Sequence, residues 1–150
     1  MPNKILWDNA PVSRGNVLTT ELNAVPLTGS SATGSEYDNS VNLDQYGACD
    51  VTLASLAAPA GGYIQLFMVQ SLDGTNYEEG IGSGSNVYPG THMLAATVNI
   101  TSGSSAKRAM SPWFRLPPNK VKFALYNGVG VATAASGNTV SLWTSNDEVQ

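Results

Sequence analysis

The stretch "YIQLFMVQSLDGTNYEEG", residues 63–80, joins the two local signals that decide the fold. Its first half is a short apolar run with aromatic and β-branched members, which is typical of a strand. Apolar side chains fall on both faces of this strand, with Phe67 and Val69 on one face and Leu66 and Met68 on the other. We therefore expect a central strand covered on both sides, with a loop, the N-terminal segment or another subunit as the second cover.

The second half of the stretch carries Asp73 and Gly74 directly after the apolar run. Glycine adopts positive φ without strain, and an aspartate side chain accepts hydrogen bonds from the backbone just after it, so the pair predicts a turn. Calcium is an alternative, because oxygen ligands are present on Asp73, Asn76, Glu78 and Glu79, but their spacing differs from that of an EF-hand loop. We interpret Asp73 and Gly74 as a structural turn and expect no metal there.

Alternation of apolar and polar residues marks further strands on both sides of this stretch. A period of two, the signature of a half-buried strand, runs through residues 41–44, 49–54, 94–100, 121–126 and 140–142. In the third of these, Leu94 would point inward with Ala96, Val98 and Ile100. Because no segment shows a helical stripe of three turns, we expect an all-β protein. Its domain would be a single small β-sandwich, jelly-roll-like, over residues 36–150.

Residues 1–35 have few periodic apolar residues, and "TGSSATGS" at residues 28–35 has the composition of a flexible linker. We expect an extended N-terminal arm over residues 1–35. Its apolar side chains would need a surface on the domain or on a neighbour. The candidate subunit or capsid contacts are Ile5, Leu6, Trp7, Val17 and Leu18.

Composition excludes several classes of function. The formal net charge is −4 and only 12% of residues are charged, so the chain lacks the positive field that a nucleic-acid partner requires. No apolar run approaches the roughly 20 residues that span a bilayer, and "MPNKILWDNAPVS" lacks the apolar core of a signal peptide. We expect neither nucleic acid nor membrane as a partner, and synthesis in a host cytoplasm.

Catalytic patterns are equally sparse. His92 is the only histidine and Cys49 the only cysteine, so they cannot supply the three or four ligands of a zinc site. Glu78 and Glu79 are adjacent, and adjacent residues of a strand face opposite sides, which does not suit a catalytic carboxylate pair. No nucleophile elbow or phosphate-binding loop is present. We expect no catalytic residues, no cofactor and no enzymatic activity.

Two longer stretches resemble one family of proteins. "FMVQSLDGTNYEEG" (residues 67–80) is similar to a strand–turn–strand common in structural proteins of tailed bacteriophages. "FRLPPNKVKFALYNGVGVATAASGNTVSLW" (residues 114–143) resembles the C-terminal part of small virion proteins. Over residues 37–146 the chain is similar to capsid decoration, or cement, proteins. The resemblance implies a β-sandwich, often trimeric, that clamps adjacent major capsid subunits on the outside of the head and needs no cofactor.

Two other functions stay open at this point. The same small sandwich would serve as a structural component of a phage tail or baseplate. A carbohydrate-binding module is also compatible with the tryptophans and tyrosines of the chain, provided that at least two of them are exposed on one face. Aromatic residues are equally frequent in cores and at protein interfaces, so their exposure decides between these readings.

Overall fold

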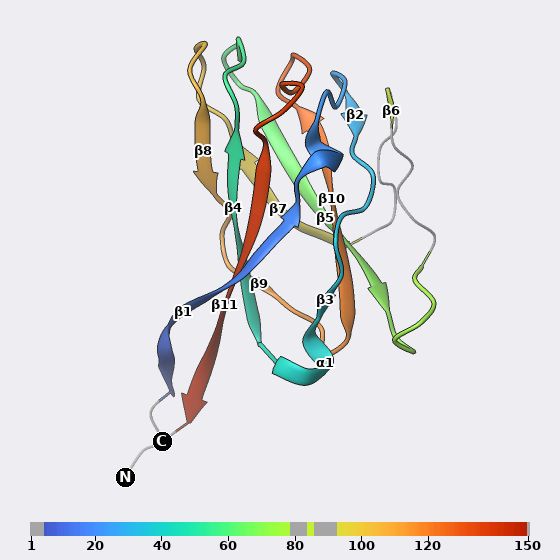
Figure 1. Ribbon diagram of the computed structural model, residues 1–150. Coiled ribbons are helices and arrows are strands. Elements are labelled where there is room, and N and C mark those ends of the chain that lie inside the picture. Colours follow the sequence, from blue (N-terminus) through green and yellow to red (C-terminus); the bar gives the residue numbers. More distant parts are fainter. Residues whose placement is uncertain (1–4, 79–83, 86–92, 150) are drawn as a thin grey trace.

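The computed structural model describes residues 5–78, 84–85 and 93–149, with side chains described for residues 10–78 and 93–147. Two antiparallel sheets pack face to face in one layer each (Figure 1), which confirms the predicted all-β sandwich. Sheet A contains, in spatial order, β1 (Ile5–Leu18), β11 (Thr139–Val149), β4 (Tyr46–Leu53) and β8 (Lys107–Met110), with β9 (Phe114–Arg115) pairing with the start of β4.

Sheet B contains β6 (Gly84–Ser85), β2 (Gly29–Ser30), β10 (Lys120–Gly128), β5 (Tyr63–Ser71) and β7 (Met93–Asn99), with β3 (Tyr37–Asp38) also pairing with β10. A 3-10 helix, η1 (Thr20–Leu22), follows β1, and one helical turn, α1 (Asn39–Asn42), follows β3.

The order of the strands is that of a jelly roll. We number β1, β2, β4, β5, β7, β8, β10 and β11 from one to eight. The two sheets then read 1-8-3-6 and 2-7-4-5. Every connection crosses from one sheet to the other except the one from β5 to β7. This interleaving places strands from both halves of the chain in each sheet.

The core lies between the sheets and follows the alternation read from the sequence. Val121, Phe123 and Leu125 of β10 are buried, as are Val140 and Leu142 of β11. On β4 the alternation of buried and half-buried residues runs without interruption from Tyr46 to Leu53. These predicted inward faces are confirmed.

Strand β5 is covered on both faces, as its apolar run predicts. Leu66 and Met68 enter the main core, whereas Phe67 and Val69 form a second, smaller cluster on the outer face of sheet B. Tyr77 packs against that second cluster, so a loop of the same chain provides cover there.

Strand β7 departs from the predicted pattern at Leu94, which is exposed instead of buried. The register against β5 shifts between Leu66 and Phe67, because Ala96 lies opposite Leu66 and Leu94 opposite Phe67. The extra residue, Ala95, forms a bulge and packs against the core. A one-residue slip reverses the face of every side chain before it, so Leu94 turns outward.

Residues 41–44 form part of a helical turn and its C-terminal cap, not the expected strand. Asp38 caps α1 by accepting a hydrogen bond from Ser40 N. Asn39 then fixes the segment, since its amide accepts from Asp44 N and donates to the carbonyls of Asp44 and Pro117. These side-chain contacts offer the backbone an alternative to strand pairing, which alternation alone does not reveal.

Residues 5–35 belong to the sandwich, which corrects the division into an arm (1–35) and a domain (36–150). Strand β1 pairs with β11 in sheet A, and β2 pairs with β10 in sheet B. Val17 and Leu18 are buried in the core. They are therefore not available to a neighbouring subunit, and that expectation is wrong.

The expected linker at residues 28–35 is a packed segment that runs beside β10. Ser31 exchanges hydrogen bonds with Leu125, and Gly34 N donates to Phe123 O. Gly34 lies so close to β1 that an added Cβ would stand 1.9 Å from the carbonyl oxygen of Val17. Small residues are needed here because the backbone of one segment approaches that of another.

Candidate functional site

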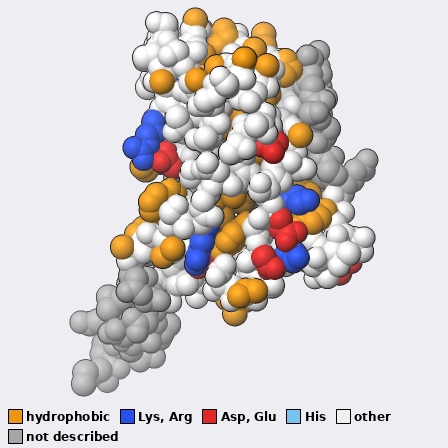
Figure 2. All heavy atoms as spheres, in the orientation of Figure 1, with side chains coloured by type: hydrophobic (Ala, Val, Ile, Leu, Met, Phe, Trp, Pro, Cys, Tyr) orange, Lys and Arg blue, Asp and Glu red, His pale blue; other side chains and the backbone are white. Residues whose placement is uncertain are grey.

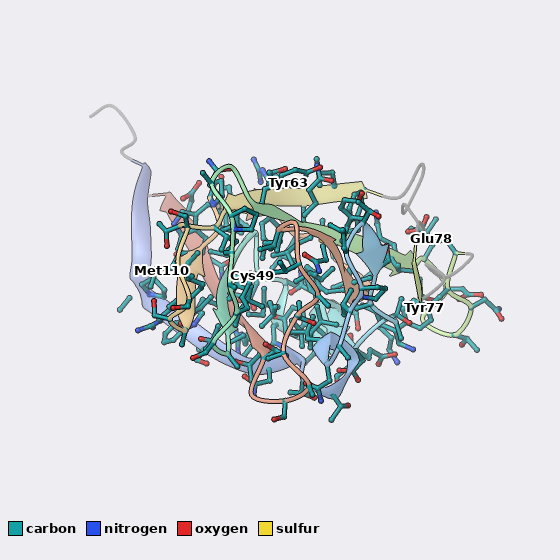
Figure 3. The ribbon with its side chains drawn as sticks, turned by 90° about the horizontal axis from the view of Figure 1, so that it is seen from above. Cys49, Tyr63, Tyr77, Glu78 and Met110 are labelled. Carbon is teal, nitrogen blue, oxygen red and sulfur yellow. The ribbon has the colours of Figure 1, made fainter. Side chains whose placement is uncertain are left out.

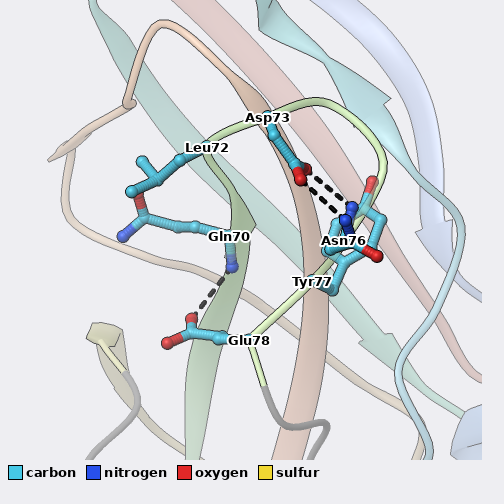
Figure 4. A pocket seen from close by; sticks show the side chains of 6 residues that line it. All are labelled: Gln70, Leu72, Asp73, Asn76, Tyr77 and Glu78. Atoms are coloured by element: carbon cyan, nitrogen blue, oxygen red, sulfur yellow. Dashed lines mark hydrogen bonds between the residues drawn. The ribbon is translucent and has the colours of Figure 1, made fainter.

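The predicted turn after β5 encloses a shallow hollow lined by Gln70, Leu72, Asp73, Asn76, Tyr77 and Glu78 (Figure 4). The Asp73 carboxylate accepts hydrogen bonds from Thr75 N at 2.9 Å, from Asn76 N at 2.7 Å and from Asn76 Nδ2 at 2.7 Å. Gly74 has φ +74°, in the left-handed region. The carboxylate of Asp73 thus points at donors of its own loop.

Hydrogen bonds from Thr75 N and from Asn76 lower the pKa of Asp73 well below its usual value. A carboxylate held in this way is a fixed acceptor and not a proton carrier at neutral pH. Glu78 closes the loop, because its backbone N donates to Gln70 O and its carboxylate accepts from Gln70 N at 2.9 Å. The hollow is therefore the inside of a turn whose acidic oxygens already have donors.

A charged cluster fastens this loop to the rest of sheet B. Tyr77 donates its hydroxyl to Glu36, Lys120 pairs with Glu36 at 3.0 Å, and Lys122 Nζ lies 4.3 Å from the centre of the Tyr77 ring. The hydrogen bonds from Tyr77 and Lys120 lower the pKa of Glu36. These contacts tie a largely exposed loop to Glu36 and to β10.

The remaining contact candidates of the N-terminal segment are only partly described. The backbones of Ile5, Leu6 and Trp7 pair with residues 147–149 of β11. The structure does not describe the side chains of these three residues, and His92 and Glu79 also lie outside the described residues.

Three aliphatic side chains project from one end of the sandwich. The exposed fractions of Val41, Leu43 and Leu72 are 78%, 59% and 88%. Lys120 lies opposite both Asp38 and Ser71 in the sheet register, so α1 and residue 72 occupy the same end. Figure 1 places α1 at the lower end of the two sheets, and Figure 2 shows a small group of hydrophobic side chains at that end and a larger group at the opposite end. We call Val41, Leu43 and Leu72 the α1 surface.

An ion pair between the half-buried Arg14 and the buried Asp44 fixes the backbone next to the α1 surface. Asp44 accepts hydrogen bonds from Arg14 Nε and Nη2, both at 2.9 Å, and from the Tyr37 hydroxyl. Burial by itself opposes the charge of Asp44, but hydrogen bonds from Arg14, Tyr37 and Thr144 outweigh burial and lower the pKa of the carboxyl group. Leu43, just before Asp44, has φ +53°. This unusual backbone for a leucine is thus fixed by the neighbouring network.

A second hollow lies on the outer face of sheet A and has a volume of about 360 Å³. Its wall contains Trp113 and Trp143, which are 41% and 37% exposed. In Figure 3 Met110, which also lines this hollow, lies on the opposite side of the molecule from Tyr77 and Glu78, and Cys49 lies further inside. We call this site the tryptophan hollow.

The sequence contained a signal for one of these tryptophans. Val140 and Leu142 alternate inward, so Trp143 has the parity of the outer face. For Trp113 no such signal exists, because it follows β8 in an irregular segment.

Other chemistry finds little support in the part of the chain that the structure describes. Among these residues no three His, Cys, Asp or Glu side chains come together as a metal site would require. Burial raises the pKa of the Cys49 thiol to about 12, so the thiol is not a nucleophile at neutral pH. The same residues include no helix long and apolar enough to cross a membrane.

Comparison with known proteins adds no family. No family model and no curated protein matches the chain. A solved structure of an arabinose-bound GH51 α-L-arabinofuranosidase is similar at a TM-score of 0.34 and 11% identity, over 98% of this chain and 22% of that one. The chain thus spans about a fifth of the length of that enzyme, and a similarity at this level carries no argument about fold or activity.

Proposed function

We propose that this protein decorates the outside of a tailed-bacteriophage head and stabilises it by binding across major capsid subunits. The observation that carries the proposal is the α1 surface, together with the resemblance of residues 37–146 to capsid decoration proteins. Apolar side chains exposed this fully at one end of the sandwich are typical of a surface that a partner covers.

The α1 surface suits a docking role because its backbone is fixed before binding. Asn39 and Asp44 hold the α1 side, and Asp73 and Glu78 hold the loop that carries Leu72. Little conformational entropy is then lost on binding. Burying each aliphatic side chain contributes about 1.5–3 kcal/mol, and many copies on one head would add their effects.

In this proposal the protein is made in the host cytoplasm and resides in the virion as a homo-oligomer, most simply a trimer. The net charge of −4 supports a protein partner over the packaged nucleic acid. Sedimentation velocity of the free protein measures the oligomer directly, and a monomer at all concentrations would limit assembly to the capsid surface.

The test uses purified heads that lack decoration, with the full chain added and bound protein measured by cosedimentation. We expect Val41→Ser and Leu72→Ser to weaken binding, each by about tenfold. Leu27→Ser, which changes a 48% exposed leucine near the start of β2, is the matched control and should bind as the original chain does.

Thermal melting of each variant separates loss of docking from loss of folding. Unchanged binding by a Val41→Ser/Leu72→Ser double variant would overturn the assignment of the α1 surface. Labelling of intact virions by antibody distinguishes a head from a tail or baseplate location, and label confined to tails would overturn the head assignment.

A further inference from the structure

The tryptophan hollow exists because a small side chain lies beside much larger ones on the outer face of sheet A. Ala48 of β4 lies directly opposite Trp143 of β11 in the register. On the other side of β4, Met110 of β8 lies opposite Asp50. The small side chain of Ala48 beside that of Trp143, and one outer-face position along β4 from Asp50, leaves a depression that Trp143, Met110 and Trp113 help to line.

The wall of the hollow also contains one polar pair of fixed geometry. Arg108 Nε lies 3.0 Å and 3.1 Å from the two carboxylate oxygens of Asp50, and Arg108 Nη2 lies 2.7 Å from Asp50 Oδ2. The Asp50 side chain is largely covered, whereas that of Arg108 is open to solvent. A carboxylate keeps lone pairs beyond those used here, and a guanidinium keeps further N–H donors. Both groups can therefore bind hydroxyl groups without leaving each other.

From these contacts we propose that the tryptophan hollow binds a pyranose ring of a glycan. A pyranose has an apolar face of C–H groups, which matches an exposed indole, and a rim of hydroxyl groups, which matches a preorganised Asp–Arg pair. The volume of about 360 Å³ lies at the lower end of the range for small-molecule sites and suits one sugar unit of a longer chain.

The polar pair favours a sugar over a purely apolar occupant. An aliphatic chain or an apolar peptide side chain seated on Trp113 and Trp143 would remove water from Asp50 and Arg108 without replacing its hydrogen bonds. The hydroxyl groups of a sugar would replace the hydrogen bonds that water makes to Asp50 and Arg108. The same comparison predicts that Asp50→Asn weakens sugar binding although the apolar walls stay intact.

Sugar binding at this site goes beyond head decoration and does not depend on it. The hollow lies on the outer face of sheet A, whereas Leu72 of the α1 surface continues β5 in sheet B. A protein docked through the α1 surface would leave the hollow free for polysaccharide on a cell surface or in the medium.

The experiment applies the full chain, without capsids, to an immobilised array of oligosaccharides that end in hexoses, N-acetylhexosamines or pentoses. Each array hit is then titrated in solution and followed by tryptophan fluorescence. We expect saturable binding that is weakened about tenfold or more by Trp143→Ala and by Trp113→Ala, and to a smaller extent by Asp50→Asn. Leu94→Ala, an exposed apolar residue on sheet B, should bind as the original chain does.

Melting temperatures of all variants show that the fold is kept, and Asp50→Asn keeps the test decisive if a tryptophan variant fails to fold. Absence of saturable binding across the array would overturn the proposal. So would binding that survives Asp50→Asn and both tryptophan variants. If these variants instead lose binding to undecorated heads while sugar binding is absent, the hollow is a protein contact and the proposal is wrong.

Discussion

Residues 28–35 and residues 72–78 are short segments rich in small and polar residues, and both lie against sheet B. The backbone N–H groups of the first segment donate to residues distant in sequence, from Ser31 to Leu125 and from Gly34 to Phe123. Most hydrogen bonds of the second segment join residues only a few positions apart, with Asp73 as the acceptor. The first is therefore part of the packed interior, and the second is a surface turn.

The comparison shows that composition does not tell a linker from a packed strand. What matters is where the backbone N–H groups find their acceptors. Local acceptors leave a signature in the sequence, such as the Asp-Gly pair, and distant acceptors leave none. Substitutions in the two segments should therefore differ in the size of their effects on stability.

The largest effect is expected from Gly34→Ala. The added Cβ would stand 1.9 Å from Val17 O and 2.7 Å from a methyl carbon of Leu18, and a backbone oxygen cannot rotate away. We expect the free energy of unfolding in urea to fall by about 3 kcal/mol. Ala32→Ser, at an exposed neighbouring position, is the control. Equal stability of the two variants would contradict the packing of residues 28–35 and favour a flexible linker there.

Asp44→Asn tests a second long-range polar contact, the one with Arg14. We expect a loss of about 3 kcal/mol at pH 7, because one charge of a largely buried pair is removed. The lowered pKa of Asp44 means that its stabilisation is complete above the unfolded value of 3.8 and is lost as pH falls through the lower folded value.

Unfolding followed between pH 7 and pH 2 should thus show a decline below about pH 4 that is reduced in Asp44→Asn. Asp50→Asn should change the stability at pH 7 little, because its partner Arg108 is open to solvent. A decline of the same size in Asp44→Asn as in the original chain would contradict the assigned role of Asp44.

A smaller effect is expected from Ser31→Ala, which removes the acceptor for Leu125 N at 2.9 Å. A buried donor without a partner costs about 1–3 kcal/mol, and water has little access because Ser31 is buried. Hydrogen exchange at Leu125 should accelerate along with the loss of stability. Slow exchange at Leu125 in the variant would show that another acceptor takes over.

The smallest effect is expected from Gly74→Val in the exposed turn. The site has room, with the nearest heavy atoms of Lys120 at 3.9 Å, so only the positive φ is unfavourable, at about 1–2 kcal/mol. Gly74→Asn is the matched control, because asparagine tolerates this backbone better. A melting temperature equal for valine and asparagine would show that the turn changes its conformation freely.

Much of the fold could be predicted from local patterns. Alternation placed Val121, Phe123 and Leu125 correctly, and the two apolar faces of β5 indicated a covered central strand. Leu94 and Val41 were misplaced because a bulge and a capped turn each depend on contacts that alternation does not encode.

The candidate sites were harder to predict, for a related reason. The tryptophan hollow requires the register that sets Ala48 opposite Trp143, and the α1 surface requires two segments about 30 residues apart to meet at Lys120. Both are products of strand pairing across the chain. A single sequence specifies such pairing only through the complete fold.

The antiparallel pairing of β1 with β11 has a mechanical consequence. Ile5 lies opposite Val149 and Leu18 opposite Val140, so the two ends of the described chain leave the sandwich side by side (Figure 1). Tension applied between them would load the hydrogen bonds of this pair one after another, as in a zipper, and not all at once, as in shear. Resistance would rise when the peeling front reached Arg14, which is paired with Asp44, and again at Val17 and Leu18, whose side chains are anchored in the core. A tether through both ends would thus be compliant at first and stiff later.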